Sequence, residues 1–110
     1  MTQNITLIVY PAKDMQTAKE FYNQFLGTEP YVDSPYYVGY KTGNLEIGLD
    51  PNATEVISYI DIADIKAELQ ALVGVGAVII QEATNVGGGL LIAKIRNSNG
   101  NILGLRQESK

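Results

Sequence analysis

The residues best placed to do chemistry lie on one predicted strand, residues 45–50, which reads Leu-Glu-Ile-Gly-Leu-Asp. Because side chains alternate along a strand, Glu46, Gly48 and Asp50 share one face, and the apolar residues between them share the other. Carboxylates are hard oxygen ligands for Mg²⁺ or Ca²⁺, and they also attract positively charged ligands. The strand therefore predicts a polar face on which Gly48 leaves a position without a side chain between the two carboxylates, and an apolar face that should meet a helix.

The side chains that are absent restrict the chemistry further. The 110 residues contain neither histidine nor cysteine. Histidine is the commonest metal ligand and the usual general base near neutral pH, and cysteine supplies thiolate ligands and nucleophiles. The sequence therefore excludes disulfides, thiolate zinc sites and histidine-activated nucleophiles. We expect no resident metal, no cofactor and no catalytic residue.

The charge balance argues against two classes of partner. Eight Lys and Arg stand against 12 Asp and Glu, for a net charge of −4, and the basic residues are scattered. Nucleic-acid binding depends on neutralising phosphates, so this balance disfavours it, and it mildly favours neutral or cationic small ligands. The apolar runs are too short to cross a bilayer, and no secretory signal is visible. We expect a cytoplasmic protein without membrane or nucleic-acid partners.

The elements that must position these residues are written twice along the chain, each time in the order β-α-β-β-β. The predicted strands are residues 5–10, 30–33, 36–41 and 45–50 in the first half, and 56–62, 77–81, 90–96 and 101–107 in the second. Each predicted helix begins at an aspartate, Asp14 or Asp64, which is a preferred N-cap residue. Apolar spacings of three and four give the first helix an aromatic stripe with Phe21 and Phe25, which we expect in the core. A short link joins the halves, so we predict one α+β domain, residues 1–110, with modules of about 1–51 and 55–108.

At this point the chain resembles the vicinal oxygen chelate superfamily, which includes glyoxalase I, bleomycin-resistance proteins and extradiol dioxygenases. The resemblance is carried by the helix from Asp14 to Gly27, by Gly76-Ala77 before the sixth strand, and by the Asn-Gly-Asn turn and closing strand at residues 99–105. It implies two β-α-β-β-β modules that form a curved mixed sheet around a cleft. Because the superfamily often pairs modules across chains, we also expect a homodimer.

In the enzymes of this superfamily the cleft holds a divalent metal, with ligands from the first and last strand of each module. The corresponding positions here are Thr6 or Leu7, Gly48, Ser58 or Tyr59, and Gly104. No choice among these alternatives gives a metal-binding set, because the two glycines supply no side chain. Close packing and the approach of a ligand would each explain a glycine at these positions.

If Gly48 and Gly104 face the cleft, the parity of the strands predicts a mostly apolar wall with a few polar groups, which is typical of small-molecule pockets. The predicted ligand-binding residues are Thr6, Tyr10, Tyr37, Glu46, Gly48, Asp50, Ser58, Gly104 and Arg106. We therefore expect a protein of the bleomycin-resistance type that sequesters a small molecule without a catalytic metal. The alternatives are a metal-dependent lyase, isomerase or dioxygenase with an atypical site, and a non-catalytic interaction module.

Overall fold

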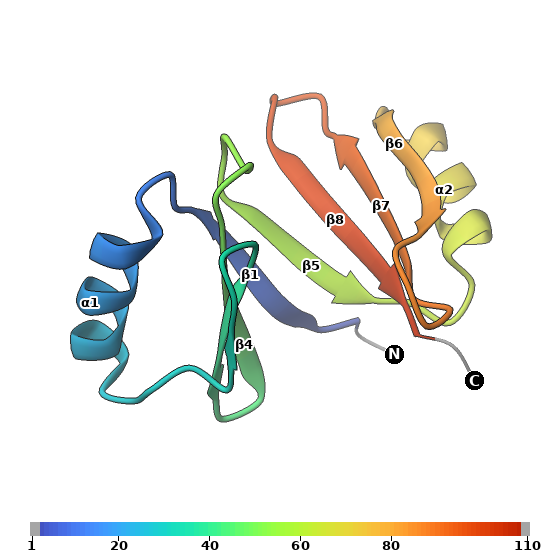
Figure 1. Ribbon diagram of the computed structural model, residues 1–110. Helices are drawn as coiled ribbons and strands as arrows, with labels where there is room; N and C mark the ends of the chain where they lie inside the picture. The colour runs from blue at the N-terminus through green and yellow to red at the C-terminus, as the bar shows by residue number, and fades with distance from the viewer. Residues whose placement is uncertain (1–2, 109–110) are drawn as a thin grey trace. The chain divides into compact units, whose positions relative to one another are not determined.

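The computed structural model describes residues 3–108, and these divide into two compact units. The N-terminal module consists of residues 6–57, and the C-terminal module of residues 58–108 together with residues 3–5. Each module has the order β-α-β-β-β, so the predicted repeat and the α+β class are confirmed (Figure 1). That the two modules form a single domain stays a prediction. No helix of the described residues is long and apolar enough to cross a membrane.

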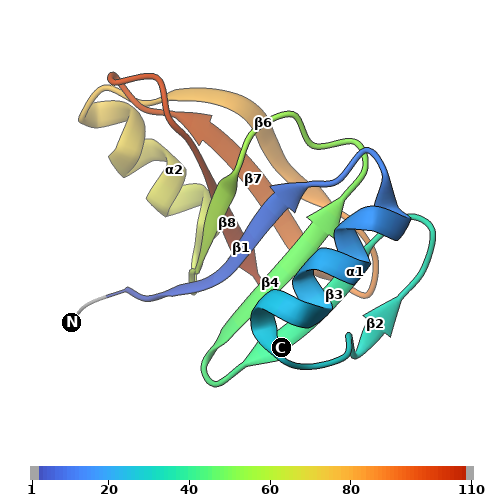
Figure 2. The same cartoon turned by 90° about the vertical axis from the view of Figure 1, so that its left-hand side faces the viewer.

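The N-terminal module is a four-stranded mixed sheet with one helix on one face (Figure 2). Its elements are β1 (Ile5–Pro11), α1 (Met15–Leu26), β2 (Val32–Asp33), β3 (Val38–Thr42) and β4 (Leu45–Asp50). The strand order is β2-β3-β4-β1, where β1 runs parallel to β4 and the other neighbours are antiparallel. The apolar residues of β4 pack against α1, as the alternation predicted; the core consists of Ala12, Val38, Tyr40, Ile47 and Leu49.

Helix α1 begins and ends as predicted, but its aromatic stripe is not buried as a whole. The Asp14 side chain accepts a hydrogen bond from the Thr17 amide at 3.2 Å, and Gly27 ends the helix at φ 69°. The expectation that Phe21 and Phe25 lie in the core is wrong, since they are 59% and 69% exposed and their rings stack at 5.7 Å. The packed stripe runs through Met15, Ala18, Tyr22 and Leu26. At 100° per residue, Phe21 and Phe25 fall on the flank of that stripe.

The C-terminal module repeats this arrangement. Its elements are β5 (Ile57–Asp61), α2 (Ile65–Gly74), β6 (Val78–Asn85), β7 (Leu91–Arg96) and β8 (Ile102–Gln107). The strand order is β5-β8-β7-β6, where β5 is parallel to β8 and the others are antiparallel. Asp64 caps α2 through the Ala67 amide at 3.1 Å, and the Ile65 amide donates to Gln107 Oε1 at 2.8 Å. The start of α2 is therefore fixed to the end of β8.

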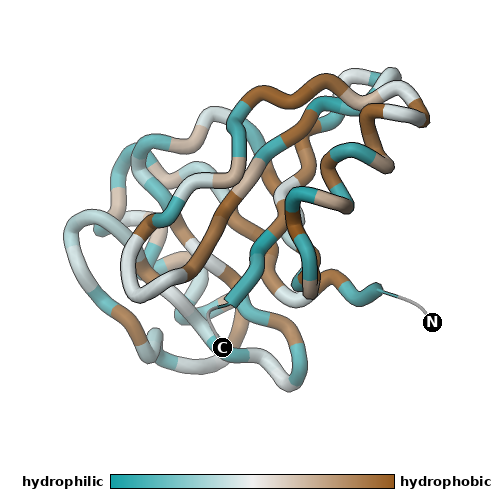
Figure 3. Tube along the Cα trace, turned by 90° about the vertical axis from the view of Figure 1, so that its right-hand side faces the viewer, coloured by the Kyte–Doolittle hydropathy of each residue, from teal (hydrophilic) through white to brown (hydrophobic). Residues whose placement is uncertain are grey.

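The hairpin between β7 and β8 sets the register of the last strand. The Asn97 side chain accepts hydrogen bonds from the amides of Asn99 at 3.1 Å and Asn101 at 2.9 Å, and Gly100 has φ 89°. This turn places Lys94 directly opposite Gly104. The neighbouring strand β6 is longer than predicted, because irregular pairing around residues 79–84 carries it past Gln81 to Asn85. Apolar and hydrophilic stretches alternate along the trace (Figure 3).

Candidate functional site

Each module has a sheet face that does not pack against its helix, and we call this its helix-free face. In the N-terminal module, Val9 lies opposite Gly48 on β1 and β4, and Gly39 lies opposite Gly48 on β3. Directly paired residues point to the same side of a sheet. The two adjacent glycines therefore leave a patch without side chains at the centre of this face.

A tyrosine ring fills that patch. A Cβ atom built on Gly48 would overlap the Tyr37 hydroxyl and would lie 2.8 Å from its ring atoms Cε1 and Cζ, closer than real Cβ atoms come. A Cβ on Gly39 would touch the rings of Tyr31 and Tyr37, each at 3.3 Å. Gly48 is thus a glycine because the chain's own aromatic side chain lies over its backbone. Packing, rather than space reserved for a ligand, explains the residue at this position.

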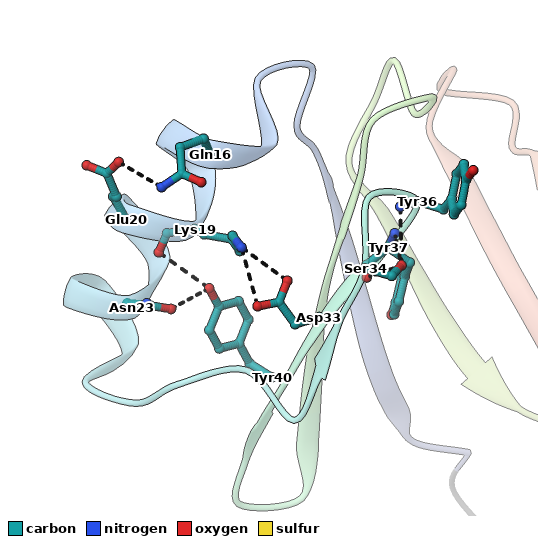
Figure 4. Close-up of polar contacts among 9 residues, drawn as sticks. All are labelled: Gln16, Lys19, Glu20, Asn23, Asp33, Ser34, Tyr36, Tyr37 and Tyr40. Carbon is teal, nitrogen blue, oxygen red and sulfur yellow. Dashed lines mark hydrogen bonds and ion pairs between the residues drawn. The ribbon is translucent and has the colours of Figure 1, made fainter.

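A short turn places Tyr37 on the helix-free face. Ser34 Oγ accepts hydrogen bonds from the amides of Tyr36 at 3.2 Å and Tyr37 at 3.1 Å, and the Ser34 amide donates to the Tyr37 carbonyl. This ring of hydrogen bonds is the local consequence of Ser-Pro, a strong turn signal. Figure 4 shows Tyr36 and Tyr37 around Ser34, whereas Tyr40 points the other way, toward α1. Tyr37 is partly buried, whereas Tyr36 is 80% exposed.

Three polar residues meet beside this aromatic patch. The Tyr31 hydroxyl donates a hydrogen bond to Glu46 Oε2. The Lys41 ammonium lies 4.6 Å from the centre of the Tyr31 ring, and Lys41 is paired across the strands with Glu46. A carboxylate, a phenol and an ammonium thus lie together on the helix-free face. Such a group can bind a polar ligand or exchange a proton with one.

The C-terminal module has the same combination of glycine and tyrosine. Lys94, Gly104 and Tyr59 form one row across β7, β8 and β5. A Cβ on Gly104 would overlap Cδ1 and Cε1 of the Tyr59 ring and would lie 2.8 Å from its Cγ. Tyr59 is only 6% exposed, so its ring is held in place over the glycine.

Arg106 lies two residues beyond Gly104, on the same face. Its Nε atom donates to Asp61 Oδ1 at 3.0 Å, and its side chain is 14% exposed. Asp61 and Arg106 are direct neighbours on β5 and β8. The partly buried ion pair orients the guanidinium group along the sheet.

The structure does not bring all nine predicted site residues to one kind of surface. Tyr37, Glu46 and Gly48 lie on the helix-free face of the N-terminal module, and Gly104 and Arg106 on that of the C-terminal module. The predicted parity of the first strand is off by one, since Leu7 and Val9 pair with Glu46 and Gly48. Tyr10, and with it Thr6, therefore points to the helix side, where Tyr10 stacks on Tyr22 at 5.4 Å.

The parity of the fifth strand is also shifted by one residue from the prediction. Tyr59, not Ser58, is the neighbour of Gly104. Ser58 instead borders a cavity of about 230 Å³ in the C-terminal module, lined by Ile5, Ser58, Ile60, Leu72, Ile95, Leu103, Gly104 and Leu105.

Asp50 ends β4, and its side chain accepts a hydrogen bond from the Asn52 amide at 2.8 Å. A role in ligand binding stays a prediction for all of these residues.

Two tyrosines on the helix side have altered acidity. Burial raises the pKa of Tyr40 above its ordinary value, and the charges of Asp33 and Glu29 raise it further. Its hydroxyl donates to Asn23 Oδ1 at 2.7 Å (Figure 4). Burial also raises the pKa of Tyr22, with a contribution from Tyr10. Both phenols therefore favour the neutral form, with Tyr40 hydrogen-bonded to Asn23 and Tyr22 packed against the Tyr10 ring.

The residues do not fit the metal site that the resemblance implies. The last strand of each module should supply a ligand, but Gly48 and Gly104 have no side chain, and Tyr37 and Tyr59 occupy the adjoining space. Among residues 3–108, no three His, Cys, Asp or Glu side chains gather in a way that would hold a metal ion.

Comparison with known proteins identifies the fold. No protein-family model matches the chain, and no curated protein matches it. A glyoxalase/bleomycin resistance protein/dioxygenase superfamily member from Vibrio splendidus 12B01 is 15% identical with a TM-score of 0.74, covering 98% of this chain and 100% of its own. Methylmalonyl-CoA epimerase from Streptomyces coelicolor, solved with 2-nitronate-propionyl-CoA, is 14% identical with a TM-score of 0.73, covering 100% of both chains.

A further solved structure carries a different activity in its name. It is described as an NAD-dependent benzaldehyde dehydrogenase from Legionella pneumophila, with 19% identity, a TM-score of 0.72, and coverage of 94% of this chain and 98% of its own. At such identities the likeness establishes the fold alone. The chain has the glyoxalase/bleomycin resistance/dioxygenase fold, which confirms the fold that the sequence resemblance implied.

Two residues of the helix-free faces, Lys94 and Tyr31, were not among the predicted site residues. Tyr59 was present only as the second choice of register beside Ser58. Lys94 follows from counting back from the Asn97–Gly100 turn, which pairs it with Gly104. Tyr31 had no signal of its own, because it precedes an edge strand of two residues and meets Glu46 only through the fold.

Proposed function

We propose that the protein binds a small organic molecule on a helix-free face without a catalytic metal, as a sequestering protein does. The observation that carries this proposal is the partly exposed pair of tyrosine rings, Tyr31 and Tyr37, lying over Gly39 and Gly48. A tyrosine offers a flat apolar surface and a hydroxyl group, which suits a planar organic ligand better than a metal ion. The name of one similar structure includes bleomycin resistance beside glyoxalase and dioxygenase, so a binding role is among those associated with this fold.

The aromatic surface of the N-terminal module is the part of the site we favour for such a ligand. Tyr31 is 50% exposed, Tyr37 lies beside it over Gly39, and Glu46 and Lys41 border the patch. A mostly flat surface with a few fixed polar groups can hold a ligand by stacking and orient it by hydrogen bonds.

The test combines metal analysis with a ligand screen. Untagged protein, purified without added metals, is analysed for its metal content and titrated calorimetrically with a panel of planar aromatic compounds. We expect no stoichiometric metal and at least one ligand, whose affinity falls about tenfold or more in Tyr37→Leu because a stacking partner is lost. Tyr36→Leu, at an exposed tyrosine of the same turn, is the matched control and should bind normally. One equivalent of nickel, zinc, iron or manganese per chain, or no ligand in a broad panel, would overturn the proposal.

A second candidate function is acid–base catalysis without a metal, and the hydrogen bond between Tyr31 and Glu46 favours it. In this reading Glu46 removes a proton from a carbon next to a carbonyl group, and Tyr31 holds the carboxylate in position. Deuterium incorporation from D₂O into candidate substrates, followed by NMR, measures this activity directly. Glu46→Gln should abolish exchange, and Glu20→Gln on the exposed side of α1 should not. Exchange that is equal in both variants would remove Glu46 from the mechanism.

Oligomeric state is a separate question. The homodimer and the cytoplasmic location stay predictions, and sedimentation equilibrium of the full chain checks the first of them.

A further inference from the structure

The helix-free face of the C-terminal module concentrates positive charge in a protein whose net charge is −4. Lys94 is opposite Gly104, Arg106 is opposite Ile92, and Arg96 is opposite Ile102, so all three side chains point to this face. They are three of the eight Lys and Arg in the chain. Charge on this face is therefore opposite in sign to the charge of the molecule.

Few carboxylates of the same module offset these cations. Asp61 is the one carboxylate in the paired rows of this face among the described residues, and it binds Arg106. Glu82 lies in the irregular part of β6 and borders a hollow beside α2 together with Lys66 and Gln70. The β6 residue paired with Lys94 is Gln81, which carries no charge.

The three cations differ in what already holds them. Arg96 Nη1 donates to the Gly100 carbonyl at 2.6 Å, which ties Arg96 to the hairpin turn. Arg106 is oriented by Asp61 through Nε. Lys94 takes part in none of the side-chain hydrogen bonds or ion pairs found among the described residues, although it is partly buried. A partly buried ammonium group without an anionic partner is stabilised by any anion that reaches it.

We propose that the helix-free face of the C-terminal module binds a small molecule that carries a carboxylate, which Lys94 holds with Arg106 as the second cation. This inference rests on the proposed small-molecule function and places a ligand on a different module from the aromatic surface around Tyr37. The Tyr59 ring fills the space over Gly104, so the apolar groups left beside Lys94 on this face are the partly buried side chains of Ile92 and Ile102. A carboxylate attached to an apolar group matches that combination. The local charge thus outweighs the preference for cationic ligands that the overall composition suggested.

The test uses a matched pair of probes that differ only in charge, 2-naphthoate and 2-naphthamide, titrated calorimetrically into the full chain. We expect the acid to bind about tenfold more tightly than the amide, as charge-assisted hydrogen bonds allow. Lys94→Gln should remove that difference by weakening the acid alone. Lys66→Gln removes the same charge from α2 of the same module and should leave both affinities unchanged. Added salt should weaken binding of the acid and not of the amide.

The possible failures are distinguishable. Equal binding of acid and amide to the unaltered protein would overturn the carboxylate and leave the small-molecule function in place. Equal loss in Lys94→Gln and Lys66→Gln would assign the effect to net charge and would also overturn the site. If neither probe binds, the inference fails for this ligand class, and a blank result from the broad aromatic panel then removes the proposed function as well.

Discussion

The close contact between Gly104 and Tyr59 makes Gly104→Ala the most informative single substitution in this protein. A methyl group at this position would overlap Cδ1 and Cε1 of the ring and would lie 2.8 Å from Cγ. Cγ is the ring atom nearest the backbone, so rotating the end of the side chain does not relieve the contact. The ring is also only 6% exposed, which leaves it no path into solvent.

Two effects of opposite sign set the magnitude. Overpacking a filled site costs about 1–3 kcal/mol in the free energy of unfolding. Replacing glycine by alanine lowers the entropy of the unfolded chain, which stabilises by about 0.4–1 kcal/mol. The steric cost is the larger effect, because a buried ring must move, and we expect a net loss of about 1.5 kcal/mol.

Urea unfolding measures this loss, with Gly74→Ala as the control. With an m-value of about 1.5 kcal/mol per molar urea, the midpoint should fall by about 1 M. Gly74 is the last residue of α2, and a Cβ there would meet nothing within 4 Å. Gly74→Ala should therefore raise the midpoint, because alanine favours the helix by up to about 1 kcal/mol.

The double variant Gly104→Ala/Tyr59→Leu separates steric conflict from other causes. Because the smaller side chain makes room for the methyl group, the two substitutions should be less destabilising together than their sum, with a coupling of about 1 kcal/mol or more. If Gly104→Ala is as stable as the unaltered protein, or if the two effects simply add, the account of Gly104 given above is wrong.

Three further predictions concern the N-terminal module. Gly48→Ala should cost less than Gly104→Ala, by about 1 kcal/mol in urea unfolding, because the atoms in conflict are the far end of the partly buried Tyr37. Tyr40→Phe should cost about 1 kcal/mol at pH 7, since Asn23 loses its donor. Burial raises the pKa of Tyr40 above its ordinary value of 10.0 in the folded protein. The stabilisation that comes from the neutral hydroxyl is therefore complete below pH 10.0 and is lost as pH rises through the folded-state pKa. Between about pH 8 and 11, the free energy of unfolding should fall less in Tyr40→Phe than in the unaltered protein. Phe25→Ser should change the free energy of unfolding by less than about 1 kcal/mol, because the ring is 69% exposed; a larger loss would place this ring in an interface.

Much of the fold was predictable because local signals agreed with one another. The alternation in residues 45–50 identified which side of β4 meets α1, and the cluster around Ile47 and Leu49 confirms it. The aspartates at positions 14 and 64 marked both helix starts, and the turn at Asn97–Gly100 fixed the last hairpin. In each case a short segment contained both the signal and its structural consequence.

The parity of the first and fifth strands was not predictable in this way. Residues 5–10 are apolar at positions of both parities, and the two residues with hydroxyl groups, Thr6 and Tyr10, lie on the helix side rather than on the face turned away from α1. Leu7 and Val9 on the helix-free face are both 6% exposed, as deeply buried as many residues on the helix side. Only the pairing with Glu46 and Gly48 decides the register, and a strand pairing is not a local property of the sequence.

The two glycines show the same limit and also explain why the metal reading fails. From the sequence alone, Gly48 is a position where a ligand residue is missing. In the structure it is one half of a contact whose other half, Tyr37, is positioned by the Ser34 turn on another part of the chain. Introducing a carboxylate at position 48 would therefore not restore a metal ligand, because the new side chain would compete with the tyrosine ring for the same space. The missing side chain and the ring are two halves of one packing contact, and the same contact recurs between Gly104 and Tyr59 in the C-terminal module.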